Sequence, residues 1–145
     1  MDHLSETQLR SLEVVKSFFV AKEKQDLDAV QVLFADDVIY RHPLNASGDP
    51  SPWFQFDGKE ETTAYQRGVI ERFSQMRMLN IESFVNPDGS TVFVTANGDY
   101  IQAVDQQHYN NLYVFKFVVE DGTITRVDEY ANPVTFAKLA GFPIG

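Results

Sequence analysis

The sequence predicts an α+β fold: a cone-shaped, strongly curved sheet of mixed or antiparallel strands, with three N-terminal helices packed on it. Before residue 78, apolar residues recur at helical spacing in three segments. From there to residue 130 the chain consists of runs rich in Val, Phe, Tyr, Ile and Thr, separated by turn signals. Helices followed by a meander of strands are typical of this class. With 145 residues, the chain is expected to form a single domain, residues 1–145.

Capping residues and helical spacing indicate the three helices. Ser5 and Gln8 form a capping box, in which each side chain accepts from the other's backbone N–H. The apolar positions that follow are Leu9, Leu12, Val15 and Phe19. Asp26 is the expected N-cap of a short second helix, whose buried positions are Leu27, Val30, Leu33 and Phe34. The third helix follows Gly58, and one of its faces carries Tyr65, Val69, Phe73 and Met76.

Alternation of side chains indicates the strands. Val38, Tyr40 and His42 alternate after residues 35–37, so we expect them on one face of the first strand. Four further strands are expected near residues 78–85, 91–103, 108–120 and 123–130. Asn97-Gly98 predicts a bulge or bend in the second of these four. A short final helix is expected from Asn132 as N-cap, Pro133 at its first position and Gly141 as C-terminal cap.

One stretch, residues 43–57, has no regular pattern. It is rich in Pro, Ser, Gly and Asp but also carries Trp53, Phe54 and Phe56. Since a solvated linker rarely holds three large aromatic residues, we expect a loop that folds over an apolar surface.

Composition excludes several classes of function. A net charge of -9 and a pI near 4.6 argue against nucleic-acid and anionic-membrane partners. The absence of cysteine excludes disulfides and thiolate sites, and the three histidines lack ligand spacing, so no metal is expected. No phosphate loop or dinucleotide fingerprint occurs, so no cofactor is expected. No membrane span or signal peptide is recognised, and a cytoplasmic location is expected.

A strongly bent sheet closed by helices encloses a pocket. Along residues 108–120, one face carries Tyr109, Asn111, Tyr113, Phe115 and Phe117, and the other carries Leu112, Val114 and Val118. Two apolar faces suggest that one lines the pocket and the other meets a second copy of the chain. A homodimer is therefore expected.

Glu129 and His42 are the candidate catalytic residues. Glu129 and Val127 are two residues apart on one strand, so both face the pocket if either does. Desolvation among aromatic rings would then disfavour the charged form of Glu129, as suits a general acid. His42 shares parity with Tyr40 and can exchange a proton near neutrality. The alternatives are an exposed or salt-bridged strand-end Glu, and a His bonded to its own loop.

Several motifs resemble the nuclear transport factor 2-like superfold, in its SnoaL-like and ketosteroid isomerase-like branch. They are QDLD and LFADD at 25–28 and 33–37, FDGKE at 56–60, NLY at 111–113 and DGTI at 121–124. The resemblance implies a cystatin-like α+β barrel that hosts isomerases, cyclases, hydrolases, dehydratases and binding proteins. It places His42 at the isomerases' general base, Phe18 at their oxyanion-hole Tyr and Tyr113 at their protonated Asp.

The C-terminal part is similar to the phenazine-biosynthesis A/B proteins, through EYANP at 129–133 and LAG at 139–141. This similarity implies that Glu129 corresponds to their catalytic Glu. Their cooperating His corresponds to Tyr65, and a nearby Ser corresponds to Val69. The resemblance thus implies that the catalytic Glu is kept as Glu129, whereas the His that cooperates with it is replaced by Tyr65.

Taken together, these features predict a pocket protein for a small apolar or aromatic ligand. The expected ligand-contacting residues are Tyr40, Trp53, Phe54, Tyr65, Val69, Asp99, Asn111, Tyr113 and Phe115. The first hypothesis is a cofactor-independent acid–base enzyme, of isomerase, cyclase, dehydratase or condensation type, acting on an apolar carbonyl or polycyclic compound. The alternatives are a non-catalytic module that binds a hydrophobic ligand, and a protein–protein scaffold with a filled cavity.

Overall fold

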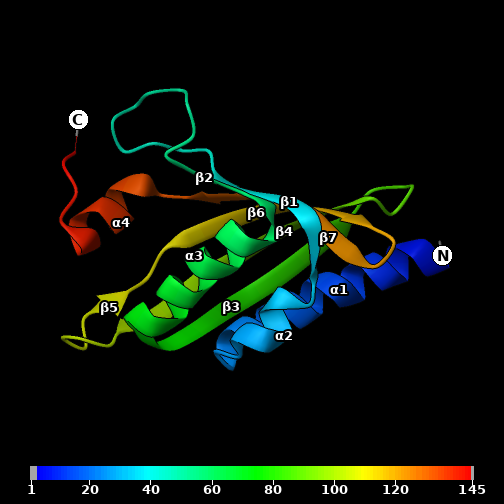
Figure 1. The fold of residues 1–145 in the computed structure, drawn as a ribbon, viewed down its shortest axis with the longest axis horizontal. Helices are drawn as coiled ribbons and strands as arrows, with labels where there is room; N and C mark the ends of the chain where they lie inside the picture. Colours follow the sequence, from blue (N-terminus) through cyan, green and yellow to red (C-terminus); the bar gives the residue numbers. More distant parts are fainter. Residues whose placement is uncertain (1–2, 145) are drawn as a thin grey trace.

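The computed structural model describes residues 3–144. The N-terminal half contains α1 (Glu6–Glu23), α2 (Leu27–Gln31), β1 (Phe34–His42), β2 (Phe54–Asp57) and α3 (Gly58–Arg72). The C-terminal half contains β3 (Phe73–Val85), β4 (Thr91–Gln102), β5 (His108–Tyr109), β6 (Leu112–Glu120), β7 (Thr123–Ala131) and α4 (Pro133–Ala140). In Figure 1, α4 and the C-terminus lie at the opposite end of the molecule from the N-terminus.

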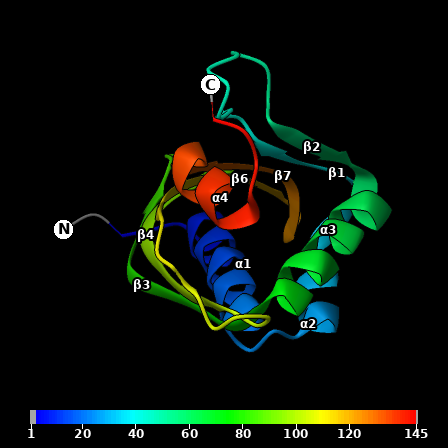
Figure 2. The same ribbon diagram turned by 90° about the vertical axis from the view of Figure 1, so that its left-hand side faces the viewer.

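The strands form one mixed sheet in the order β2-β1-β7-β6-β4-β3, with β5 paired to β4. The β1–β7 pair is parallel and the other pairs are antiparallel. Figure 2 shows the sheet curving around α1, with α3 beside it and α4 across one end. The sheet does not close on itself. The predicted fold class is therefore confirmed.

The capping predictions are confirmed as well. Ser5 and Gln8 make both bonds of the capping box at the start of α1. Asp26 caps α2, and Asn132 caps α4 through the backbone N–H of Val134. Gly141 ends α4 with a φ of 80°, a left-handed conformation that glycine adopts without a steric cost.

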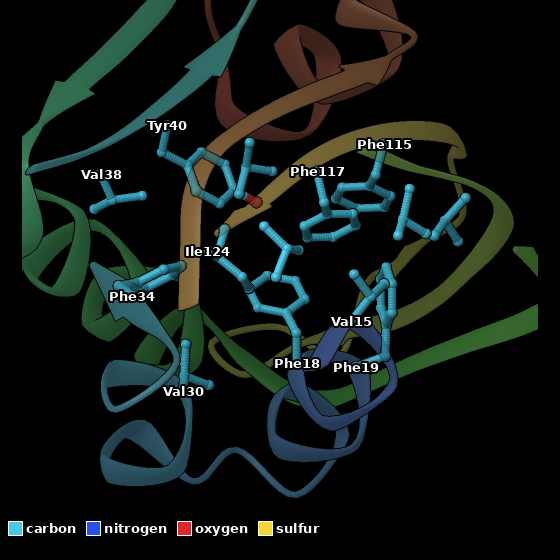
Figure 3. Close-up of a cluster of buried hydrophobic side chains, with 14 of the residues drawn as sticks. Val15, Phe18, Phe19, Val30, Phe34, Val38, Tyr40, Phe115, Phe117 and Ile124 are labelled. Atoms are coloured by element: carbon cyan, nitrogen blue, oxygen red, sulfur yellow. The ribbon is translucent and has the colours of Figure 1, made fainter. Parts of the chain in front are cut away.

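The core lies between α1 and the concave face of the sheet. Phe18 and Phe19 of α1 point at Phe115 and Phe117 of β6 (Figure 3), with edge-on ring contacts at centroid distances of 5.1 to 5.7 Å. Such contacts add stabilisation beyond the burial of apolar area. A second, smaller cluster contains Phe73, Met76, Tyr100 and Tyr109.

The third helix is shorter than predicted. It ends at Arg72, and Phe73 and Met76 lie in β3, which begins at Phe73 instead of residue 78. The pairing of β3 with β4 shifts register between Phe73 and Gln75. Because this irregularity lets residues three positions apart both turn inward, the strand imitates a helical period in the sequence.

The predicted strand 108–120 is divided at residues 110 and 111 into β5 and β6. Its two faces are as predicted: Tyr113, Phe115 and Phe117 are buried, whereas Leu112 and Val114 are exposed.

The irregularity predicted at Asn97-Gly98 lies instead in the neighbouring strand. There the register shifts between Leu79 and Glu82, and Asn80 has a φ of 56°. Gly98 serves another purpose, because a Cβ there would lie 2.7 Å from Cε2 of Tyr113. Within residues 3–144, no helix is both long and apolar enough to cross a membrane.

Candidate functional site

A cavity of about 440 Å³ opens inside the curved sheet, and such volumes suit drug-sized ligands. Both hydrophobic clusters contribute to its walls, which combine α1, α3, the inner face of the sheet and the C-terminal segment. The rings that line it include Phe18, Phe19, Phe56, Tyr65, Phe73, Tyr100, Tyr109, Tyr113 and Phe115.

Glu129 brings a carboxylate into this apolar cavity. Tyr40 donates a hydrogen bond from its hydroxyl to Oε1 of Glu129 over 2.5 Å. The ring of His42 lies on the other side, with Nδ1 3.5 Å from Oε2. The three side chains thus form one cluster at the end of two parallel strands.

The pairing of β1 with β7 explains this cluster. Tyr40 pairs with Val127, and Arg41 pairs with Asp128. Side chains alternate along each strand, so the Arg41–Asp128 ion pair, at 2.9 Å, lies on the outer face. Glu129 is then carried to the inner face, where β1 presents Tyr40 and His42.

Burial sets the protonation of the two partners of Glu129. Burial raises the pKa of Tyr40 well above its ordinary value, and the charge of Glu129 raises it further, so the phenol remains a donor. Burial lowers the pKa of His42; Glu129 opposes that effect and Lys22 adds to it. The imidazole is therefore neutral at pH 7, and its Nε2 is buried without a hydrogen-bond partner among the described residues.

Tyr65 joins the cluster from α3. Its ring stacks on Phe56 at a centroid distance of 4.3 Å and meets the His42 ring edge-on at 5.2 Å. Burial raises the pKa of Tyr65 and of Tyr113 well above the ordinary value. Both phenols therefore stay protonated and are able to donate hydrogen bonds.

Aromatic side chains from the loop before β2 and from the C-terminal segment line one part of the cavity. Trp53 contacts Phe54, Phe136 and Phe142 at centroid distances of 4.9, 5.9 and 5.6 Å. Figures 1 and 2 both show the loop before β2 reaching toward the C-terminal segment. The stretch thus lies over an apolar surface, as predicted from its aromatic residues. Its last four residues, Phe54–Asp57, are not part of a loop as predicted, because they pair with β1 as the edge strand β2.

Most of the predicted site residues line the cavity: Glu129, His42, Trp53, Phe54, Tyr65, Val69, Tyr113 and Phe115. Tyr40, which was predicted to contact the ligand, does not line the cavity, because it is completely buried; it contacts the carboxylate of Glu129 instead. Asn111 lies behind the wall, where its side chain donates to the Tyr109 hydroxyl and to the backbone oxygen of Asn132.

The structure does not bring Asp99 to the cavity. Its neighbour Tyr100 faces inward, so Asp99 points to the outer face of β4. There it accepts hydrogen bonds from the guanidinium of Arg77, at distances of 2.5 and 3.2 Å. The prediction that Asp99 contacts a ligand is therefore wrong, because its side chain lies on the face of β4 opposite the cavity.

Sequence reasoning missed two charged residues that line the cavity, Lys22 and Arg72. The signal for Lys22 is its helical spacing from Val15, Phe18 and Phe19, which puts a lysine on the buried face of α1. Its Nζ donates to Oε1 of the fully buried Gln66, at 2.5 Å. Arg72 carries the same signal, because it lies three residues after Val69 and seven after Tyr65, on the face of α3 that lines the cavity.

A comparison with protein families identifies the group to which the fold belongs. The model of the SnoaL-like domain matches residues 15–127. The chain belongs to this family. The SnoaL-like match confirms the resemblance inferred from the motifs.

Solved structures resemble this SnoaL-like chain over nearly its whole length. A candidate isomerase from Bacillus subtilis is 17% identical, with 97% of this chain and 99% of that one covered and a TM-score of 0.82. A phenazine biosynthesis-related protein from Pseudomonas aeruginosa is 21% identical, with 97% and 90% covered and a TM-score of 0.81. A candidate polyketide cyclase from Xanthomonas campestris is 22% identical, with 90% and 96% covered and a TM-score of 0.74.

At these identities the likeness shows the fold alone. No curated protein matches the sequence.

Proposed function

We propose that this SnoaL-like protein is a cofactor-independent acid–base enzyme that acts on a small apolar carbonyl or polycyclic compound. The observation that carries the proposal is the carboxylate of Glu129 inside an aromatic cavity, held by Tyr40 and adjacent to a neutral His42. A carboxylate that lines the cavity lies within reach of a ligand bound there, and it is a group that is able to accept and return a proton.

Each polar side chain of the site has its own role in the proposed proton transfers. Glu129 removes a proton from the carbon next to the ligand's carbonyl and returns it at another position. His42 orients the carboxylate or serves as a second base, because its ring is neutral and lies 3.5 Å from Oε2. Tyr65 or Tyr113 donates to the oxyanion that develops on the carbonyl oxygen. Isomerisation, cyclisation, dehydration and condensation all use these proton transfers.

The similar structures support this choice of chemistry without deciding among the reactions. Two of them are described as a candidate isomerase and a candidate polyketide cyclase. A third is described as related to phenazine biosynthesis. The resemblance of residues 129–133 to the phenazine-biosynthesis A/B proteins implies that Glu129 corresponds to their catalytic Glu.

The exchange of a ligand proton with solvent tests the proposal. Wild-type protein is incubated in heavy water with tetralone, a fused-ring ketone that matches the apolar walls, and deuterium at the α-carbon is followed by mass spectrometry. We expect exchange above the buffer rate, and its loss in Glu129→Gln, which keeps the size of the side chain. Glu120→Gln, at an exposed position, is the matched control and should exchange like wild type.

Two results would contradict the proposal. Full exchange by Glu129→Gln would remove this residue from the chemistry. Tetralone that quenches the fluorescence of Trp53, the only tryptophan, but never exchanges would favour the non-catalytic binding module.

We also propose that the outer face of the sheet forms a homodimer interface. Large apolar side chains are exposed there on β3, β4 and β6: Phe84, Phe93, Leu112 and Val114. Exposed patches of this kind mark interaction surfaces. Sedimentation equilibrium should give twice the chain mass for wild type and the chain mass for Phe93→Glu. A monomeric wild-type protein would refute the interface.

A further inference from the structure

Lys22 is a basic group of the cavity that the proposed proton transfers do not use. It lies on the buried face of α1, and its side chain is 7% exposed. The Nζ atom lies 5.6 Å from the centre of the Phe18 ring and donates one hydrogen bond, to the neutral amide of Gln66. Among residues 3–144, no carboxylate forms an ion pair with this amine.

An amine in this position differs from the surface lysines of the chain. Burial lowers the pKa of Lys22 from 10.5 to about 8, and the charge of Glu129 opposes that effect. The other ionisable groups that line the cavity are His42, the guanidinium of Arg72, and the phenols of Tyr65, Tyr100, Tyr109 and Tyr113. His42 and the four phenols are neutral at pH 7, because burial lowers the pKa of the imidazole and raises the pKa of each phenol. At pH 7 about a tenth of Lys22 is therefore the free base, against less than about a thousandth of an exposed lysine.

Free amines in apolar pockets add to carbonyl groups. We propose that Lys22 is a covalent binding site for aldehydes and ketones, which it holds in the cavity as an imine. The inference rests on the proposed function, because it places a carbonyl ligand in the same cavity. It adds a second way to make the carbon next to the carbonyl acidic, since a protonated imine withdraws electrons more strongly than a ketone.

The step balances without an oxidant or a reductant. The lone pair of Nζ forms a bond to the carbonyl carbon, and the carbonyl π electrons move to oxygen. Oxygen gains a proton and nitrogen loses one, which gives a carbinolamine. Its hydroxyl then takes up a second proton and leaves as water while the C=N bond forms. Glu129 and His42 are the groups of the cavity able to exchange these protons.

Reductive trapping tests the site. The protein is incubated with naphthaldehyde and sodium cyanoborohydride, which reduces an imine to a stable amine, and the modified peptides are identified by mass spectrometry. We expect Lys22 to be labelled first, with a rate that levels off above about pH 8, whereas exposed lysines react faster up to about pH 10. Lys22→Met should lose the fast label, and Lys16→Met, at an exposed position of the same helix, should keep it.

A competition experiment in wild-type protein does not depend on whether Lys22→Met folds. Tetralone occupies the cavity and should slow the labelling of Lys22 in wild-type protein, but not the labelling of exposed lysines. Labelling confined to exposed lysines, while naphthaldehyde still quenches Trp53, would overturn the covalent site. That result would leave the proposed function standing, because the function is judged by deuterium exchange in Glu129→Gln.

Discussion

The burial of Lys22 should make the stability of the fold depend on pH in a defined window. In the folded protein its pKa is lowered from 10.5 to about 8, so the unfolded chain holds this proton more tightly than the folded one. Because one pKa unit corresponds to about 1.4 kcal/mol, keeping Lys22 charged inside the fold costs about 3 kcal/mol at pH 7. The cost disappears as the pH rises from about 8 to 10.5, so stability should increase across that window.

A difference measurement isolates this contribution. Urea unfolding of wild type and of Lys22→Met is followed by far-UV circular dichroism between about pH 7 and pH 10. The lost bond to Gln66 changes the difference in unfolding free energy by a constant, and the tyrosines titrate in both proteins. We expect wild type to gain up to about 3 kcal/mol relative to Lys22→Met across the range. A difference that does not change with pH would show that the amine is solvated, and would refute the burial argument. Lys16→Met provides the control with a constant difference.

Other variants test neighbouring features. Because the pKa of His42 is lowered in the folded protein, the unfolded chain binds a proton on this ring first as the pH falls. In acid unfolding, wild type should therefore lose stability relative to His42→Gln below about pH 6.5. His108→Gln, at an exposed position, should show no such trend. Gly98→Ala pushes a Cβ into the ring of Tyr113 and should cost about 1–3 kcal/mol in urea unfolding; equal stability would refute the close approach. Gly68→Ala has open space in α3 and should gain about 0.5–1 kcal/mol; a loss would contradict that assignment.

Much of the fold could be predicted from residues that are close together in the sequence. The caps at Ser5, Asp26 and Asn132 depend on a few neighbouring residues, and the structure contains each of them. The two faces of β6 follow from alternation, which requires no knowledge of the neighbouring strand. The end of α3 was not readable, because a bulged strand gave Phe73 and Met76 a helical spacing.

The candidate site, like the fold, could be predicted from the sequence only in part. Strand parity was enough to bring Glu129 and His42 together once β1 and β7 lay side by side. The position of Asp99 depended on which parity of β4 faced inward, and the parity of Tyr100 decides that point. Lys22 was readable as a lysine on an apolar helix face. Its partner Gln66 comes from another helix, so the pairing became visible only in three dimensions.

The most direct test of Glu129 as the acid–base group of the cavity is a crystal structure of the protein with tetralone bound. We expect the ketone inside the cavity, with its α-carbon against the carboxylate of Glu129. Its oxygen should lie within hydrogen-bond distance of the hydroxyl of Tyr65 or Tyr113, or its carbonyl carbon should be joined to Lys22 as an imine. A ketone that binds outside the cavity, or a Glu129 side chain turned to solvent, would contradict the claim.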